Sequence, residues 1–341
     1  MHSAIQVLER IPRERLAHRP TPLEDAPRLG AAISLPRLRV KRDDATGLAF
    51  GGNKARKLEF LLADARSQGA DVLLTTGGAQ SNHARMTAAA ARRLGMEAIL
   101  FLCDAPPAEE QGNLLLDRIL GAEVRFLPGL PLEEIYRRME AAAEALRHAG
   151  RRPYFIPVGG STALGCLGYV DAVRELAEQA GGRAPDALVI AAGSTGTLAG
   201  VLLGTRLFLP RTRVYGISVS PPAPAGRRKC ARIAAEAAAL LGVDWQPAPE
   251  EIPILDDWLG AGYGIPTPEG MDALRLAART EGLLLDPVYT AKALAGAIGL
   301  AARSELRPED EVVYWHTGGA PALFAFGPHV LERSKGGLSG A

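Results

Sequence analysis

Short apolar runs alternate with amphipathic or alanine-rich segments along most of the chain. The runs have the length of buried strands, and the longer segments have helical periodicity. This alternation is typical of α/β proteins with mainly parallel sheets. Strands are expected at 72–76, 98–102, 123–127, 187–192, 213–219 and 311–316. Helices are expected at 56–67, 84–94, 113–120, 132–149, 171–179, 198–207, 230–241, 268–281 and 291–303.

These elements form two series along the chain, which predicts two domains. Residues 57–160 contain the first three expected strands and resemble a small doubly wound unit. Residues 161–341 contain the second series, which ends in a strand that enters a glycine turn. The last residues, 334–341, are expected to form a frayed tail.

Composition narrows the function classes. The 39 basic and 38 acidic residues nearly cancel, which argues against a nucleic-acid or anionic-membrane surface. The three cysteines lie far apart, without a CxxC pair, so the sequence favours reduced thiols in the cytosol over disulfides or a zinc site. The uncharged stretch 187–205 is as long as a membrane span. Its central residues 193–197 are small or polar, which favours a strand, a loop and a buried helix start.

Lys54 is the first candidate for chemistry. It follows Gly51-Gly52-Asn53 at the start of an expected helix. The glycines allow the backbone to pass close to a ligand, and the helix N-terminus lowers the pKa of an amine. A lysine so placed is able to form a Schiff base with a carbonyl cofactor. The alternative is a surface loop with a solvated Lys-Arg-Lys cluster.

Two glycine-rich turns are candidate anion sites. In the first, Ser81, Asn82 and His83 precede an expected helix, where N–H, hydroxyl and amide groups are able to hold a carboxylate. Ser81 or Asn82 is equally a common helix N-cap residue. In the second, Gly193-Ser194-Thr195-Gly196-Thr197 links a buried strand to a helix, which favours phosphate binding over a plain tight turn. It lacks the spacing of a nucleotide-binding motif.

Two tyrosines and two threonines complete the candidates. Tyr289 and Thr290 follow an Asp-Pro-Val turn, and Tyr263 lies between two glycines. Either tyrosine is able to stack on a flat ring or act as an acid, although each alone is more often structural. Thr317 follows the last strand, where its hydroxyl would meet a ring nitrogen or cap the next helix.

Together and in this order, the motifs resemble pyridoxal-phosphate enzymes of the tryptophan synthase β type, or fold type II. Within that group they resemble the family of D-cysteine desulfhydrase and 1-aminocyclopropane-1-carboxylate deaminase. The resemblance extends from Pro20-Thr21-Pro22-Leu23-Glu24 and Val40-Lys41-Arg42-Asp43-Asp44 to Gly318-Gly319-Ala320-Pro321-Ala322-Leu323. It implies pyridoxal 5'-phosphate as cofactor, a larger cofactor-binding domain of residues 1–56 and 161–341, a smaller domain of residues 57–160, and an active site in the cleft between them. A homodimer is a further implication.

The resemblance also implies roles for the candidate residues. On the cofactor side, Lys54 matches the Schiff-base lysine, and Asn82 matches the residue near the phenolic oxygen. Thr290 and Thr317 match positions near the pyridine nitrogen. The phosphate cup is matched by Gly193, Ser194, Thr195, Gly196 and Thr197.

On the substrate side, Ser81, Asn82 and His83 match the loop that receives the carboxylate. Tyr289 matches the tyrosine beside the ring, and Tyr263 matches a second active-site tyrosine. Lys54, Ser81, Tyr289 and Tyr263 are therefore the catalytic candidates, with Lys54 or a tyrosine removing the α-proton.

Three positions distinguish the members of this family. The deaminases have Gln, Glu and Leu where this chain has His83, Thr290 and Thr317. A carboxylate beside the ring nitrogen makes the ring a strong electron sink, which suits opening a cyclopropane. A threonine leaves a weaker sink, which suffices when the β-carbon carries a good leaving group. The sequence therefore favours α,β-elimination of D-cysteine to pyruvate, hydrogen sulfide and ammonia.

Several alternatives stay open. Thr195 replaces a common glycine and Met86 a common glutamine, so 1-aminocyclopropane-1-carboxylate deaminase and L-cysteate sulfo-lyase activities remain alternatives. A nucleotide-dependent oxidoreductase would need an acidic residue at the end of strand 213–219, which has none. A non-catalytic binder would need Lys54 or Tyr289 replaced, and both are present.

Overall fold

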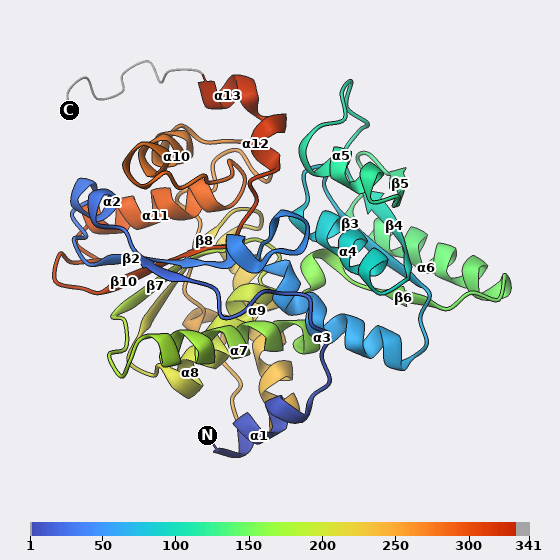
Figure 1. Ribbon diagram of the computed structural model, residues 1–341, viewed down its shortest axis with the longest axis horizontal. Helices are drawn as coiled ribbons and strands as arrows, with labels where there is room; N and C mark the ends of the chain where they lie inside the picture. The colour runs from blue at the N-terminus through green and yellow to red at the C-terminus, as the bar shows by residue number, and fades with distance from the viewer. Residues whose placement is uncertain (1, 332–341) are drawn as a thin grey trace.

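The computed structural model describes residues 2–331, which contain two sheets with helices on both faces (Figure 1). The strands of the larger sheet are, in spatial order, β1 (Leu23–Asp25), β2 (Leu38–Arg42), β10 (Val312–His316), β7 (Ala187–Ala192), β8 (Arg213–Ser218) and β9 (Ile254–Leu255). Only β1 is antiparallel to its neighbour. The strands of the smaller sheet, all parallel, are β5 (Glu123–Phe126), β4 (Glu97–Leu102), β3 (Val72–Gly77) and β6 (Pro153–Phe155).

The larger sheet is buried on both faces, which explains its continuous apolar strands. In β7, Leu188 and Ile190 face one core, whereas Val189 and Ala191 face the other. The first core is covered by α1 (His2–Arg10), α7 (Ala163–Gln179), α8 (Gly196–Phe208) and α9 (Ala223–Leu240). The second is covered by α2 (Pro27–Ala32), α10 (Pro268–Glu281) and α11 (Thr290–Ala302).

The smaller sheet also separates two cores. One lies under α3 (Lys54–Ser67), α4 (Asn82–Arg93) and α5 (Gly112–Ile119), and the other under α6 (Leu132–His148). Because α3 packs on both α4 and α7, it lies between the two sheets (Figure 1). The domain boundaries at residues 57 and 161 stay a prediction.

Short elements complete the described part of the chain. Two C-terminal helices follow β10, namely α12 (Ala322–Ala325) and α13 (Gly327–Leu331). The 3-10 helices are η1 (Asp43–Thr46), η2 (Leu48–Phe50), η3 (Val158–Gly160) and η4 (Pro249–Glu251).

The α/β class and the alternation of strands and helices are confirmed. The predictions at 187–192 and 268–281 agree with β7 and α10 at both ends. The expected start of α7 at Asp171 was wrong, because the helix continues through Gly165 and Gly168. A Cβ at Gly168 would lie 2.2 Å from the carbonyl oxygen of Arg56, so glycine here permits close packing on α3.

Other expectations fail for similar reasons. Helix α9 begins at Ala223, before the expected Cys230. The prediction missed the first turns because Pro224 and Gly226 interrupt the helical pattern in the sequence. The short strands β1, β2, β6 and β9 were not predicted. The uncharged stretch 187–205 contains β7, a turn and most of α8, and no helix within residues 2–331 is long and apolar enough to cross a membrane. The tail predicted at 334–341 lies outside the described residues.

A buried ionic cluster joins α3 to the larger sheet. Arg56 Nη2 lies 2.9 Å from Asp43 Oδ1 and 2.8 Å from Glu175 Oε1. Lys41 Nζ lies 2.6 Å from the same Glu175 oxygen, and the Tyr169 hydroxyl donates to Asp43. Although burial favours the neutral acid, hydrogen bonds and charge from Arg56 lower the pKa of Glu175 to about 2. The cluster therefore stays ionised at neutral pH.

Replacing Arg56 by methionine should destabilise the fold strongly, because two buried carboxylates lose their main cation. We expect the free energy of unfolding to fall by about 3 kcal/mol or more. Arg66→Ala, which removes an exposed pair with Glu14 (3.2 Å), is the control and should cost less than about 1 kcal/mol. Urea denaturation of both variants measures the difference, and equal losses would contradict a stabilising role for the cluster.

Candidate active site

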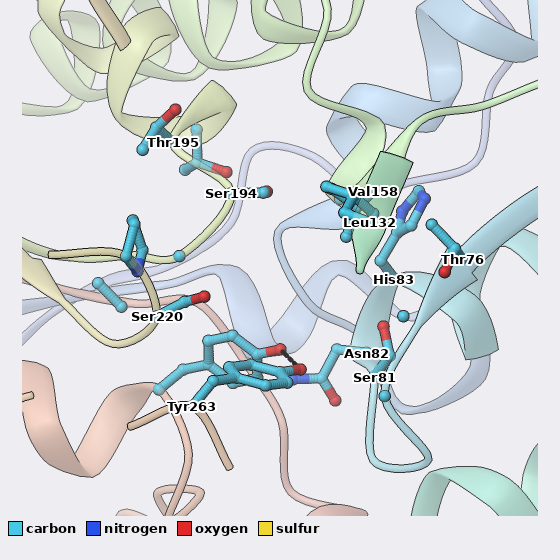
Figure 2. Close-up of a pocket in the computed structure, with 18 of the residues that line it drawn as sticks. Thr76, Ser81, Asn82, His83, Leu132, Val158, Ser194, Thr195, Ser220 and Tyr263 are labelled. Atoms are coloured by element: carbon cyan, nitrogen blue, oxygen red, sulfur yellow. Dashed lines mark hydrogen bonds between the residues drawn. The ribbon is translucent and has the colours of Figure 1, made fainter. Parts of the chain in front are cut away.

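A cavity of about 440 Å³ lies where the loops after β3, β7 and β10 meet the first turn of α3. This is the usual place for a ligand site in parallel α/β sheets, because the carboxyl ends of the strands leave a crevice there. Figure 2 shows Ser194 and Thr195 on one side of the cavity, Ser81, Asn82 and His83 on the other, and Tyr263 near its base. The predicted site residues that line it are Lys54, Ser81, Asn82, His83, Gly193, Ser194, Thr195, Thr197, Tyr263, Tyr289 and Thr317.

Lys54 is the first residue of α3 and faces this cavity. Gly51 and Gly52 have positive φ angles of 67° and 132°, so they permit the turn that leads into Lys54. Burial, and then the charge of Lys229, lower the pKa of Lys54 to about 8. A substantial neutral fraction of the amine is therefore present near neutral pH. The solvated-cluster alternative is wrong, because Arg56 and Lys57 are buried.

The loop after β7 leads into the N-terminus of α8, a position that suits an anion. Thr195 has a left-handed φ of 69°, and its buried Oγ1 has no hydrogen-bond partner within residues 2–331. The first N–H groups of a helix also lack partners within the helix. Ser161 Oγ donates to Ser194 Oγ (2.8 Å), and the Gly196 N–H donates to Ser161 Oγ (3.3 Å). Gly196 therefore shapes the loop, although it does not line the cavity.

Two lysines that were not predicted as site residues, Lys57 and Lys229, contact this loop region or line the same cavity. Lys57 Nζ donates to the Gly159 carbonyl (2.6 Å) and to Ser161 Oγ (3.1 Å), and burial lowers its pKa well below the usual value. Lys229 lines the cavity, and burial lowers its pKa as well. Lys57 follows Lys54 by three residues, a spacing that places both on the same side of the helix. Lys229 had no comparable signal, because it precedes the expected start of its helix.

The turn before α4 performs the capping role that the sequence suggested. Ser81 is the N-cap residue, and its Oγ accepts the Ala84 N–H at 3.2 Å. Thr75 Oγ1 donates to the Ile156 carbonyl, so at the 2.8 Å contact with His83 it accepts from Nε2. Burial lowers the pKa of His83 well below the usual value, so its ring is neutral with Nδ1 unprotonated.

Tyr263 and Tyr289 act as a pair. Their hydroxyl oxygens lie 2.5 Å apart, and their rings meet edge to face with centroids 5.9 Å apart (Figure 2). Burial raises the pKa of both tyrosines, so both hydroxyls are protonated at neutral pH. Asp286 orients the turn, because its Oδ2 accepts the Val288 and Tyr289 N–H groups at 2.9 Å.

The two threonines expected near the ring nitrogen have different positions. Thr317 lines the cavity, and its carbonyl accepts the Asn53 N–H at 2.9 Å. Thr290 does not line the cavity, because its Oγ1 donates to Asp286 Oδ1 at 2.7 Å in the buried turn. Thr317 therefore lines the cavity, whereas Thr290 lies behind Tyr289 in the buried turn.

The free helix N-terminus, the unpartnered Thr195 hydroxyl and two nearby lysines, Lys57 and Lys229, fit a phosphate dianion, while Lys54 offers an amine at the same cavity. Residues 14–318 of this chain match the family described as pyridoxal-phosphate dependent enzymes. The chain belongs to this family. The predicted cofactor and the predicted type II fold are therefore confirmed.

Two curated relatives are similar to almost the whole chain. A D-cysteine desulfhydrase of Yersinia enterocolitica is 43% identical over 334 residues, covering 95% of this chain and 98% of the relative. A D-cysteine desulfhydrase of Klebsiella pneumoniae is 42% identical over 338 residues, covering 96% and 100%. The solved structure of an ACC deaminase homologue is 41% identical, with a TM-score of 0.90, and the similarity covers 97% of this chain and 99% of that one.

The depressed pKa of Lys54 predicts an unusual pH dependence for its reactivity. Because only the neutral amine attacks an aldehyde, labelling of the cofactor-free protein with formaldehyde and cyanoborohydride should become half-maximal near pH 8. N-acetyl-lysine amide is the control and should require a pH near about 10.4. Peptide mass spectrometry measures labelling at Lys54, and a profile matching the free amine would contradict the assigned environment.

Proposed function

We propose that this protein catalyses the α,β-elimination of D-cysteine, followed by hydrolysis with one water, to pyruvate, hydrogen sulfide and ammonia. The similarity to D-cysteine desulfhydrases over nearly the whole chain supports this proposal. The observation that carries it is the placement of Lys54, the α4 and α8 N-termini and two protonated tyrosines around one cavity. When bound, pyridoxal phosphate supplies the electron sink that stabilises negative charge at the α-carbon.

Residues in three parts of the cavity are assigned to phosphate binding, carboxylate binding and proton transfer. The anion site at the start of α8, with Lys57 and Lys229 beside it, holds the phosphate. The turn at Ser81, at the start of α4, receives the substrate carboxylate through N–H groups. Lys54 accepts the α-proton, because its lowered pKa leaves a neutral amine available.

The Tyr263–Tyr289 pair supports a second part of the reaction. Both hydroxyls are protonated at neutral pH, since burial raises their pKa values. One hydroxyl donates to the other, so the second proton is free to donate toward the cavity. We assign this pair to donating a hydrogen bond to the departing sulfur, a role that a protonated phenol is able to perform.

The cavity lining favours elimination over cyclopropane opening. No aspartate or glutamate lies among the residues that line the cavity in the described part of the chain. A ring nitrogen there would lack a carboxylate partner to keep it protonated, which leaves a weaker electron sink. A weaker sink suits a substrate with a good leaving group on the β-carbon, so D-cysteine is favoured over 1-aminocyclopropane-1-carboxylate.

We further propose that the protein acts in the cytoplasm as a homodimer. The cysteines Cys103, Cys166 and Cys230 are all unpaired, which suits a reducing compartment. Phe50 and Phe324 expose 67% and 74% of their surface, and apolar side chains of this kind are common at subunit contacts. The family resemblance supports the same assembly.

A substrate panel tests the activity. D-cysteine, L-cysteine, L-cysteate and 1-aminocyclopropane-1-carboxylate are supplied to the holoenzyme, and keto acid and sulfide are measured. D-cysteine should give the highest kcat/KM, and Lys54→Ala should lower turnover by about 10²-fold or more. Faster conversion of the cyclopropane substrate or of L-cysteate would replace the proposed reaction with that activity.

The dimer has its own test. Light scattering after gel filtration should give twice the chain mass of 36.0 kDa. The measurement is made at micromolar protein with bound cofactor. A measured mass equal to one chain at micromolar protein would disprove the homodimer and leave the proposed reaction unaffected.

A further inference from the structure

Asn113 contacts Asn82 and the turn that precedes it. Asn113 lies in α5 and is fully buried. Its Nδ2 donates to the Gln80 carbonyl and to Asn82 Oδ1, both at 2.9 Å. Its backbone N–H donates to Gln80 Oε1 at 2.9 Å. One side chain of α5 therefore holds the turn before α4 and the side chain of Asn82.

These contacts determine which way the Asn82 amide points. A backbone carbonyl only accepts hydrogen bonds, so the Asn113 group facing Gln80 must be its NH₂ group. The second hydrogen of that NH₂ group then requires an acceptor, which makes Oδ1 the Asn82 atom facing α5. Asn82 Nδ2 consequently points the other way, and Figure 2 shows the Asn82 amide directed into the cavity toward Tyr263.

We propose that Asn113 is a positioning residue that makes Asn82 present a hydrogen-bond donor, and not an acceptor, to the bound cofactor's phenolic oxygen. This rests on the cofactor-binding role that the family resemblance gives to Asn82. A donor stabilises the deprotonated oxygen and lowers its pKa, whereas an amide oxygen at the same place would repel it. Asn113 thus acts on the cofactor without touching it.

Several charged and titratable groups lie around this pair. The titratable residues that line the same cavity are Lys54, His83, Cys103, Lys229, Tyr263 and Tyr289. The Asp104 carboxylate accepts the Ala79 N–H in the turn before α4. Arg85 lies three residues after Asn82 on α4, and its Nη2 donates to the Gly51 carbonyl at 2.9 Å. Asp117 lies four residues after Asn113 on α5, and burial raises its pKa to about 8. Because Asp117 changes charge near pH 8, within the pH titration of the absorption band, Asp117→Asn is a required control.

The test compares Asn113→Asp and Asn113→Ala with the wild type, and repeats both changes in an Asn82→Ala background. The readouts are the dissociation constant of pyridoxal phosphate, from titration of cofactor-free protein, and the midpoint pH of its visible absorption band. Aspartate is nearly isosteric but carries no NH₂ group, so Asn82 must turn its own NH₂ group toward α5. We expect the dissociation constant to rise about tenfold and the midpoint pH to rise by about one unit.

The double variants distinguish positioning of Asn82 by Asn113 from a general structural role of Asn113. If Asn113 acts through Asn82, its replacement should change neither readout further in the Asn82→Ala background. Equal changes in both backgrounds, or none in the wild-type background, would overturn the proposal. If Asn113→Asp does not fold, the same comparison is made with Asn113→Ala.

Two matched controls complete the design. Glu110→Gln exchanges acid and amide at an exposed residue paired with Arg118 (3.0 Å), and should leave both readouts unchanged. Asp117→Asn should leave the effect of Asn113→Asp in place, and loss of that effect would assign it to Asp117. Both readouts need cofactor and no substrate. A failure of the proposed D-cysteine reaction would therefore not be mistaken for a failure of Asn113 to position Asn82.

Discussion

The rest of the site depends on the first turn of α3, which the buried pairing of Arg56 with Asp43 and Glu175 fixes against the larger sheet. Removing charges from water is unfavourable, so such a cluster persists only where its geometry is well satisfied. Here the satisfied geometry leaves Arg56 directed at the larger sheet, while Lys57 holds the Gly159 carbonyl. Lys54, at the start of the same turn, is left facing the cavity with a lowered pKa.

Local electrostatics, and not overall charge, make this cavity suitable for an anion. The chain carries a net charge of only +1, yet Lys54 and Lys229 line the cavity, and Lys57 bonds the carbonyl of Gly159, which also lines it. Burial lowers the pKa of each of these lysines, and an anion bound beside them would favour their charged form again. Two helix N-termini, of α4 and α8, add N–H donors at opposite walls.

Hydrogen bonds across the cavity join elements that are far apart in the sequence. Asn53 Nδ2 donates to Thr197 Oγ1 at 3.0 Å, which links the turn that carries Lys54 to the start of α8. The Asn53 N–H also donates to the Thr317 carbonyl, which links the same turn to the end of β10. The turn that carries Lys54 is therefore bonded both to the loop after β7 and to the end of β10.

The sequence by itself determined the α/β class, the order of the main elements, and the turns that carry Lys54, Ser81 and Gly193. Each of those features has a local signal in the sequence. The signals are the spacing of apolar residues, glycines just before a helix, and hydroxyl side chains at a helix N-terminus. Only the tertiary structure decided that Lys57 bonds Ser161 and that Lys229 lines the cavity. It alone also decided that Thr290 bonds Asp286 instead of lining the cavity, and that Asn113 bonds Asn82. These contacts join residues by the packing of whole helices and strands, which no short stretch of sequence encodes.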